Sequence, residues 1–241
     1  MPQRPAASII DLAERIHSPR GNRLTALAEK AYREIKQMVL ENKVHGGEYL
    51  LEEDLARALG MSRTPLREAL VQLQTERLIS LVARRGNRIV PLTVEDMREV
   101  YELLEWLESQ AACALAQRSD RERYLPELRE LTGRMKTALA AGDMVAWAKA
   151  NDQFHIRLVA SAGNRRLIQI CENLLDQSQR VRAFTLRARK PPVRTTEAHA
   201  RMLRAIENGD ADKAAEIQRE NKRAWLVELQ ELIERLQLRY L

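Results

Sequence analysis

The segment Gly60–Leu73, reading GMSRTPLREALVQL, constrains the fold more than any other part of this chain. Just before it, Leu51–Leu59 has the pattern of a short helix, and Gly60 is suited to end that helix. In the next helix the apolar residues recur at one-turn steps, at Leu66, Ala69, Leu70 and Leu73. Two short helices joined by a tight turn predict a helix-turn-helix.

The second of these helices begins with basic and hydroxyl side chains. Ser62 or Thr64 can serve as its N-cap, and Pro65 in the first turn breaks no intrahelical hydrogen bond. Arg63 and Arg67 lie one turn apart and off the apolar face. Because an arginine at a helix N-terminus can donate two hydrogen bonds to guanine, this pattern predicts contact with DNA. The alternative is a solvated helix face, with Arg67 paired to an acid of the preceding helix.

A helix before this motif and a hairpin after it complete one domain. From Thr25 the apolar residues recur at helical spacing, until the glycine pair at 46–47 ends the element. Residues 79–90, reading ISLVARRGNRIV, form two β-prone runs around a turn expected at Arg85–Arg88. A helix-turn-helix followed by such a hairpin is a winged helix.

Pro91 and the capped helix start at Thr93 place a domain boundary at residues 90–93. The chain is therefore expected to comprise a flexible arm at 1–24, a winged helix-turn-helix at 25–91 and a helical domain at 92–241. The expected helices of the last domain are 94–118, 121–141, 143–162, 165–189, 194–208 and 210–239. Three breaks pair a glycine with a capping residue, at Gly142-Asp143, Gly163-Asn164 and Gly209-Asp210.

Composition agrees with a mainly α protein, an N-terminal winged helix followed by an all-helical bundle. Aromatic residues make up 4% of the chain and glycines number 9. Residues 1–91 hold 15 Lys and Arg against 11 Asp and Glu, so most of the net charge of +6 lies there. Cys113 and Cys171 are far apart and are expected to be reduced core thiols. The sequence contains no long apolar run, so we expect no membrane partner and a cytoplasmic protein.

The segment LGMSRTPLREAL at residues 59–70 resembles the turn of the GntR family of bacterial transcription regulators. Downstream, the chain resembles the C-terminal FCD domain of FadR-type members through Asn151, Phe154, His155, Ser161, Gly163, Asn164, His199, Leu203, Ala205, Ile206, Gly209 and Asp210. The resemblance implies binding to double-stranded DNA as a homodimer on an inverted repeat, controlled by a small-molecule effector. The DNA contacts that we expect are Ser62, Arg63, Thr64 and Arg67 in the helix and Arg84, Arg85, Gly86 and Asn87 in the wing.

The same resemblance implies a pocket in the bundle, where an Asp or Asn and three histidines hold a divalent metal beside the effector. Here Asn151, His155 and His199 match, but Asn221 stands where the third histidine is expected. An amide is a poor ligand for zinc or nickel, so two interpretations stay open: a weak Zn or Ni site, or hydrogen-bonded pocket residues without an ion.

Two other positions depart from the family pattern. Leu104 stands where relatives commonly carry an arginine that helps to bind an acidic effector, so a more apolar or neutral effector becomes plausible. Arg77 stands where relatives often have glycine at the end of the recognition helix. The basic run Arg180, Arg182, Arg187 and Arg189 is expected to be a solvated face near a helix C-terminus.

Two other functional classes fit less well. A metal-dependent hydrolase using Asn151, His155 and His199 would lack a nearby general base and a recognised catalytic motif. A helical scaffold without DNA binding would leave the SRTPLRE turn and the arginine-rich wing unexplained. The sequence therefore predicts a ligand-responsive regulator, a repressor in most of the family, and no enzyme.

Overall fold

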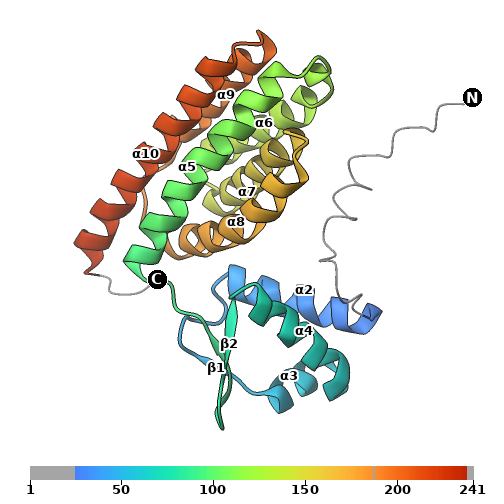
Figure 1. Cartoon of the computed structure of the whole chain (residues 1–241). Helices are drawn as coiled ribbons and strands as arrows, with labels where there is room; N and C mark the ends of the chain where they lie inside the picture. The colour runs from blue at the N-terminus through green and yellow to red at the C-terminus, as the bar shows by residue number, and fades with distance from the viewer. Residues whose placement is uncertain (1–24, 187, 238–241) are drawn as a thin grey trace, which may run out of the picture. The chain divides into compact units, whose positions relative to one another are not determined.

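Two helices joined at Gly60 form the helix-turn-helix in the computed structural model, which describes residues 25–186 and 188–237 (Figure 1). They are α3 (Glu52–Leu59) and α4 (Arg63–Thr75). Gly60 takes the left-handed conformation, with φ of 61°, and the next amide, of Met61, donates to the carbonyl of Ala56 at 3.0 Å. This cap ends α3 because glycine adopts positive φ without a steric penalty.

The chain divides into two compact units. The first comprises residues 25–36 and 49–87, and the second comprises residues 37–48 and 88–237. The division at 87 and 88 lies just before the boundary expected at 90–93. The arm expected at residues 1–24 lies outside the described residues.

The first unit adds α2 (Ala26–Leu40), which continues into the second unit, and a small sheet. The strands are β1 (Tyr49–Leu50), β2 (Ile79–Val82) and β3 (Gly86–Ile89), in the order β1-β3-β2. The expected apolar face of α4 is buried, with Leu66 and Leu73 both 0% exposed. The strand β1 was not predicted, because two residues carry no detectable alternation.

The turn of the hairpin lies earlier than the sequence predicts. The turn residues are 83–85, with Arg84 at φ of 62°, so Gly86, Asn87 and Arg88 belong to β3 rather than to the turn. The register follows from tertiary contacts that local turn preference does not contain. Asn87 is buried and accepts a hydrogen bond from Nε2 of Gln74 at 2.8 Å, and β3 pairs with β1 on its other side.

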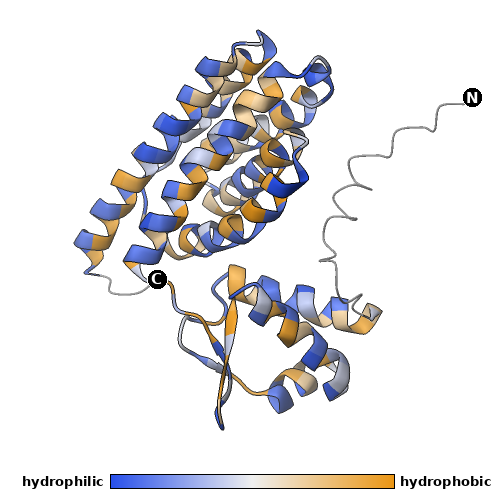
Figure 2. Ribbon diagram, in the orientation of Figure 1, coloured by the Kyte–Doolittle hydropathy of each residue, from blue (hydrophilic) through white to orange (hydrophobic). Residues whose placement is uncertain are grey.

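The second unit is a helical bundle. Its helices are α5 (Val94–Gln117), α6 (Leu125–Ala140), α7 (Met144–Ser161), α8 (Arg165–Thr185), α9 (Val193–Glu207) and α10 (Ala211–Leu236), with a short 3-10 helix η1 (Arg121–Arg123) before α6. The helix α5 packs along α10, α8 and α7, and α6 packs along α7 and α9. Figure 2 shows hydrophobic and hydrophilic residues alternating along these helices, as expected when one face of each is buried. The six expected helices are confirmed, although α8 ends at Thr185, before the predicted residue 189.

Local capping signals set the breaks between the bundle helices. Thr93 and Asp96 form a capping box at the start of α5. The three glycines at the predicted breaks, Gly142, Gly163 and Gly209, all have positive φ. The residue that follows each glycine caps the next helix with its side chain, as Asp143 does for the amide of Ala146 at 2.9 Å. These predictions from sequence are confirmed.

Cys171 is buried, Cys113 is partly exposed, and neither is in a disulfide. Burial raises the pKa of the Cys171 thiol to about 12, so it stays protonated at neutral pH. In the described part of the chain, no helix combines the length and the apolar character that crossing a membrane requires.

Arg77 occupies a backbone conformation that favours glycine. It follows the C-cap of α4 with φ of 58°, and the amide of Leu78 donates to the carbonyl of Leu73 at 3.1 Å. A left-handed residue with a Cβ costs roughly 1–2 kcal/mol. Glycine therefore suits this turn better than arginine.

We expect Arg77→Gly to stabilise the winged helix by about 0.5–1 kcal/mol, because the relief of strain exceeds the entropy that glycine adds to the unfolded chain. Hydrogen exchange of the amides of α4 in the full-length protein measures this change. Arg77→Ala removes the same side chain but keeps the strain, so it should give no gain. Equal gains in both variants would show that the strain is not the cause.

Candidate functional site

The N-terminus of α4 presents an exposed basic and hydroxyl surface. Ser62, Arg63, Thr64 and Arg67 are all exposed, while the opposite face of α4 packs into the core. Ser62 is the N-cap, but its hydroxyl makes no capping hydrogen bond. These four predicted DNA contacts are therefore accessible from solvent, beside the free amide groups of a helix N-terminus, which suit phosphate.

Each recognition arginine is paired with an acid of α3. Nη2 of Arg63 donates to Oε1 of Glu53 at 2.6 Å, and Nε of Arg67 donates to Oε2 of Glu52 at 2.8 Å. The arginine side chains remain 59% and 62% exposed, respectively. Exposed pairs of this kind contribute about 0–1 kcal/mol, so they are easily exchanged for another anion.

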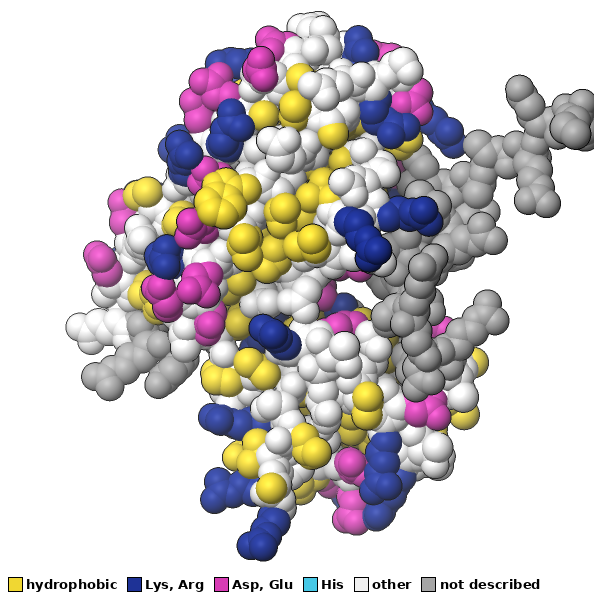
Figure 3. Space-filling model, in the orientation of Figure 1, with side chains coloured by type: hydrophobic (Ala, Val, Ile, Leu, Met, Phe, Trp, Pro, Cys, Tyr) yellow, Lys and Arg dark blue, Asp and Glu magenta, His cyan; other side chains and the backbone are white. Residues whose placement is uncertain are grey.

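The wing adds a second basic surface. Arg84 and Arg85 are exposed at the turn of the hairpin, and Figure 3 shows basic side chains at its tip. Gly86 begins β3 with φ of 88°, and a Cβ there would lie 3.5 Å from the carbonyl oxygen of Leu50. Asn87 does not match the expectation that all four wing residues face DNA. It is 1% exposed and bound to Gln74, so its side chain positions β3 and is not directed to solvent.

A small cavity of about 20 Å³, partly open to solvent, lies in the bundle. Its lining combines aromatic, amide and cationic side chains: Tyr101, Trp147, Asn151, His155, Arg182, Arg189, Thr195, Asn221, Lys222 and Trp225. Three of the five residues predicted for the effector pocket are in this lining. Leu104 is fully buried but does not line the cavity. His199 is not in the lining either, but it contacts Asn151, which is.

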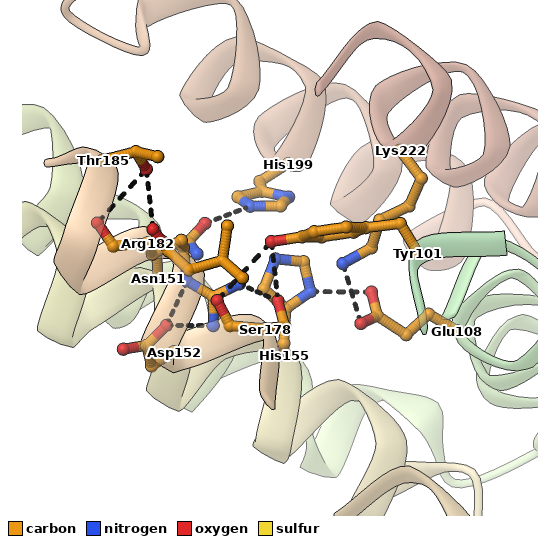
Figure 4. Close-up of polar contacts among 11 residues, drawn as sticks. Tyr101, Glu108, Asn151, Asp152, His155, Ser178, Arg182, Thr185, His199 and Lys222 are labelled. Carbon is orange, nitrogen blue, oxygen red and sulfur yellow. Dashed lines mark hydrogen bonds and ion pairs between the residues drawn. The ribbon is translucent and has the colours of Figure 1, made fainter. Parts of the chain in front are cut away.

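The two histidines lie close together but face different partners (Figure 4). The ring centroids of His155 on α7 and His199 on α9 are 5.1 Å apart, with the planes at 76°. Nε2 of His199 contacts Oδ1 of Asn151 at 3.2 Å, whereas Nδ1 of His155 lies 2.8 Å from Oε2 of Glu108. Burial lowers the pKa of both imidazoles, that of His199 most, which favours their neutral forms at neutral pH.

A buried carboxylate stands at the centre of this polar cluster. Glu108 on α5 is 0% exposed, and its Oε1 lies 2.8 Å from Nζ of Lys222 on α10. Gln218, one turn earlier on α10, donates to Oε2 of the same carboxylate. Burial alone would raise the pKa of Glu108, but His155 and Lys222 hold it below its ordinary range. Glu108 is therefore a buried anion at neutral pH.

Two arginines of the predicted solvated run line the cavity instead. Arg182 is buried and donates from Nε to Oδ1 of Asp152 on α7 at 2.6 Å. The guanidinium carbon of Arg189 lies 4.1 Å from the ring centroid of Trp225 and 5.1 Å from that of Trp147. The expectation of a solvated face was wrong for these residues, because acids on other helices compensate their charge. Arg180 is also buried, and Arg187 lies outside the described residues.

Glu108, Arg182 and Lys222 were not identified from the sequence as pocket residues. One signal for Glu108 existed, because it continues the buried stripe of α5 that contains Tyr101, Leu104 and Leu115. A charged residue within an apolar stripe indicates a buried partner. The partner itself, Lys222, could not be found by spacing along the chain.

The residues around the histidines do not suit a divalent metal. The amide oxygen of Asn151 is engaged by His199, and Asn221 offers another weak amide ligand. Among residues 25–186 and 188–237, no group of three or more His, Cys, Asp or Glu has a geometry that could hold a metal ion. The chemistry of this donor set favours hydrogen bonding over coordination.

Comparison with known proteins gives matches for both units. Residues 27–89 match the family described as bacterial regulatory proteins, gntR family, and residues 99–224 match the FCD domain. An uncharacterized HTH-type transcriptional regulator of Agrobacterium vitis, in the TAR-I ttuE-ttuC' intergenic region, is 37% identical over 134 residues, or 55% of this chain and 78% of that protein. The HTH-type transcriptional repressor GlaR of Escherichia coli (strain K12) is 27% identical over 194 residues, or 76% and 88% of the two chains.

A solved structure supports the same fold. The structure of E. coli McbR/YncC has a TM-score of 0.74 with 21% sequence identity, and the match covers 86% of this chain and 98% of that chain.

We expect Asp152→Ala to destabilise the bundle by about 3–5 kcal/mol, because it leaves the guanidinium of Arg182 buried without its anion. Urea denaturation followed by tryptophan fluorescence measures this loss, since all three tryptophans lie in the bundle. Glu130→Ala removes the exposed pair with Arg134 and should cost about 0–1 kcal/mol. A loss below about 1 kcal/mol in Asp152→Ala would contradict the assignment of a buried pair.

Proposed function

Because this chain belongs to the GntR family of bacterial regulatory proteins and carries an FCD domain, we propose that it binds an inverted-repeat operator as a homodimer and that a small molecule in its bundle controls this binding. The chain is a helix-turn-helix transcription regulator. The observation that carries the finer proposal is the exposed surface of Arg63 and Arg67 at the start of α4, together with the exposed arginines of the wing. As a DNA-binding regulator, it would act in the bacterial cytoplasm.

The energetics favour DNA over the glutamates of α3 as the partner of Arg63 and Arg67. A bidentate contact between arginine and guanine discriminates between bases by roughly 1–3 kcal/mol, whereas an exposed pair with glutamate contributes about 0–1 kcal/mol. Arg63 and Arg67 can therefore leave Glu53 and Glu52 for base edges or phosphates. Arg84 and Arg85 of the wing would contact the adjacent groove or backbone.

Dimerisation follows from the small reach of one winged helix. One recognition helix reads a few base pairs, so two copies related by a two-fold axis extend the site and set the spacing of half-sites. On α5, Leu103 and Trp106 are 41% and 54% exposed at i, i+3 spacing, and Figure 3 shows hydrophobic side chains gathered on the bundle surface. We assign this face of α5 to the contact between copies.

The cavity suits a small ligand with an anionic group better than the apolar or neutral ligand expected from Leu104. Arg182, Arg189 and Lys222 line the cavity, while the acids that pair with them are not in the lining. Cationic groups that face the cavity can bind a carboxylate or phosphate with charge-assisted hydrogen bonds. The aromatic rings of Trp147 and Trp225 would contact the rest of the ligand.

In this mechanism α5 connects the cavity to the DNA-binding unit along the chain. Tyr101 and Glu108 of α5 take part in the polar network of the cavity, and α5 begins shortly after the wing. A ligand that favours one position of α5 would change the spacing of the two winged helices of a dimer. Repression relieved by the ligand is the usual outcome in this family.

Hydrolysis is a weaker proposal for the same pocket. The relatives that match this chain are named transcription regulators. The buried carboxylate of Glu108 is paired with Lys222 and lies against His155, which leaves it unsuited to act as a general base. We therefore propose a binding pocket and no enzymatic activity.

We expect Arg63→Ala and Arg67→Ala each to weaken specific operator binding by about 5- to 150-fold, because each loses a contact worth roughly 1–3 kcal/mol. Electrophoretic mobility shift at fixed salt, with a labelled fragment from upstream of the protein's own gene, measures the change. Arg33→Ala on α2 is the matched control, since it removes another exposed arginine paired with a glutamate. Unchanged binding by both recognition variants would refute the assignment of α4.

We expect Trp106→Glu to convert the dimer to a monomer, because the new charge would be buried against the partner copy. Light scattering during size-exclusion chromatography measures the mass, and operator binding should weaken in parallel. Val145→Glu, at another exposed apolar position, should leave the dimer intact. A monomeric wild type would refute dimerisation, and a dimeric Trp106→Glu variant would refute this interface.

A further inference from the structure

We propose that the ammonium group of Lys222 takes the place of a divalent metal ion in the bundle pocket, as the fixed positive charge to which polar oxygen atoms of a ligand bind. This inference rests on the proposed ligand pocket and is independent of DNA binding. It assigns a function to a buried cation that the sequence did not single out.

The donor set that remains around the pocket is poor in metal ligands. Of the four positions at which the family places metal ligands, two are asparagines, and Asn151 already contacts Nε2 of His199 through its oxygen. His155 directs Nδ1 to Glu108, at 2.8 Å. The contacts with His199 and Glu108 hold Asn151 and His155 in place without a metal, and among the described residues Nδ1 of His199 has no hydrogen-bond partner.

Lys222 lies at the position where a metal ion would be expected. It directly follows Asn221, the residue that replaces the third histidine, and both side chains line the cavity together with Asn151 and His155. The side chain of Lys222 is only 5% exposed. The positive charge therefore lies within the same small cavity as the residues that would otherwise hold an ion (Figure 4).

The charge of Lys222 is held in place by the surrounding helices. A buried ammonium without a counter-ion costs several kcal/mol. Glu108 supplies the counter-ion, with Oε1 at 2.8 Å from Nζ, and contacts with His155 and Gln218 orient the carboxylate from its other side. Three helices, α5, α7 and α10, thus fix one cation as a metal site fixes its ion.

The chemistry of an ammonium allows this substitution. The ammonium carries three N–H donors, and a single carboxylate oxygen cannot accept from all three. It also needs no deprotonated ligands from the protein. It offers charge and hydrogen bonds to ligand oxygens, although it lacks the directional coordination of zinc. A pocket built on Lys222 would bind its ligand without regard to zinc or nickel supply.

The first experiment measures metal binding by the full-length wild type. The protein is dialysed against a chelator and then titrated with Zn²⁺ or Ni²⁺ alone by calorimetry, with the thermal midpoint followed in parallel. We expect no saturable site and no rise in Tm. One tightly bound ion per chain, lost in His155→Ala, would overturn the proposal.

The second experiment removes the ammonium. Lys222→Ala leaves the Glu108 carboxylate buried beside the imidazole of His155, so a divalent cation can now supply the missing charge. We expect Zn²⁺ at about 100 times its Kd to raise the Tm of this variant by about 5 °C or more. The matched control Glu108→Gln/Lys222→Ala lacks the carboxylate and should show no such shift.

Lys222→Gln, an uncharged side chain of similar reach, repeats the test if Lys222→Ala does not fold. If neither variant folds alone, recovery of folded protein on adding Zn²⁺ becomes the readout. Absence of zinc stabilisation or zinc-dependent folding in both variants would reduce Lys222 to a structural ion-pair partner and overturn the proposal. None of these measurements involves DNA, so their failure is distinct from a failure of operator binding.

Discussion

Buried charges must be compensated inside the bundle, and the arrangement of four helices depends on that requirement. A carboxylate removed from water costs several kcal/mol unless a cation and hydrogen bonds replace the solvent. Glu108 on α5 has Lys222 of α10 and His155 of α7 at 2.8 Å each. Asp152 and Arg182 join α7 to α8 in the same way. A shift of any of these helices by one residue would leave a buried charge without its partner.

The same type of contact has the opposite consequence at the protein surface. Arg63 and Arg67 pair with glutamates at distances as short as those in the bundle, yet solvent screens these pairs. Water can replace the partner of an exposed arginine, whereas it cannot reach the partner of Lys222. Burial, rather than distance, therefore decides whether DNA can replace the acidic partner of a cation or whether the ion pair holds the fold.

The sequence predicted features that depend on neighbouring residues and missed features that depend on residues far apart in the chain. The breaks at Gly142, Gly163 and Gly209 were predicted because a cap needs only neighbouring residues. The hairpin turn was misplaced because its register depends on β1 and on the contact between Gln74 and Asn87. For the site, spacing along α7 brought Asn151 and His155 to one face, but it could not show that they line a cavity with Lys222.

The sequence by itself determined the helix-turn-helix, the wing, the order of the helices and the family. Helix periodicity, capping and the SRTPLRE turn are all encoded within about a dozen residues, so they can be read without a structure. Only the tertiary structure decided which charges are buried. Gln218 and Glu108 are separated by 110 residues, and Arg182 and Asp152 by 30. A charged side chain can be buried where a distant part of the chain supplies a counter-charge or, as the carbonyl of Val90 does for Arg180, a hydrogen-bond acceptor, and local sequence does not contain that information.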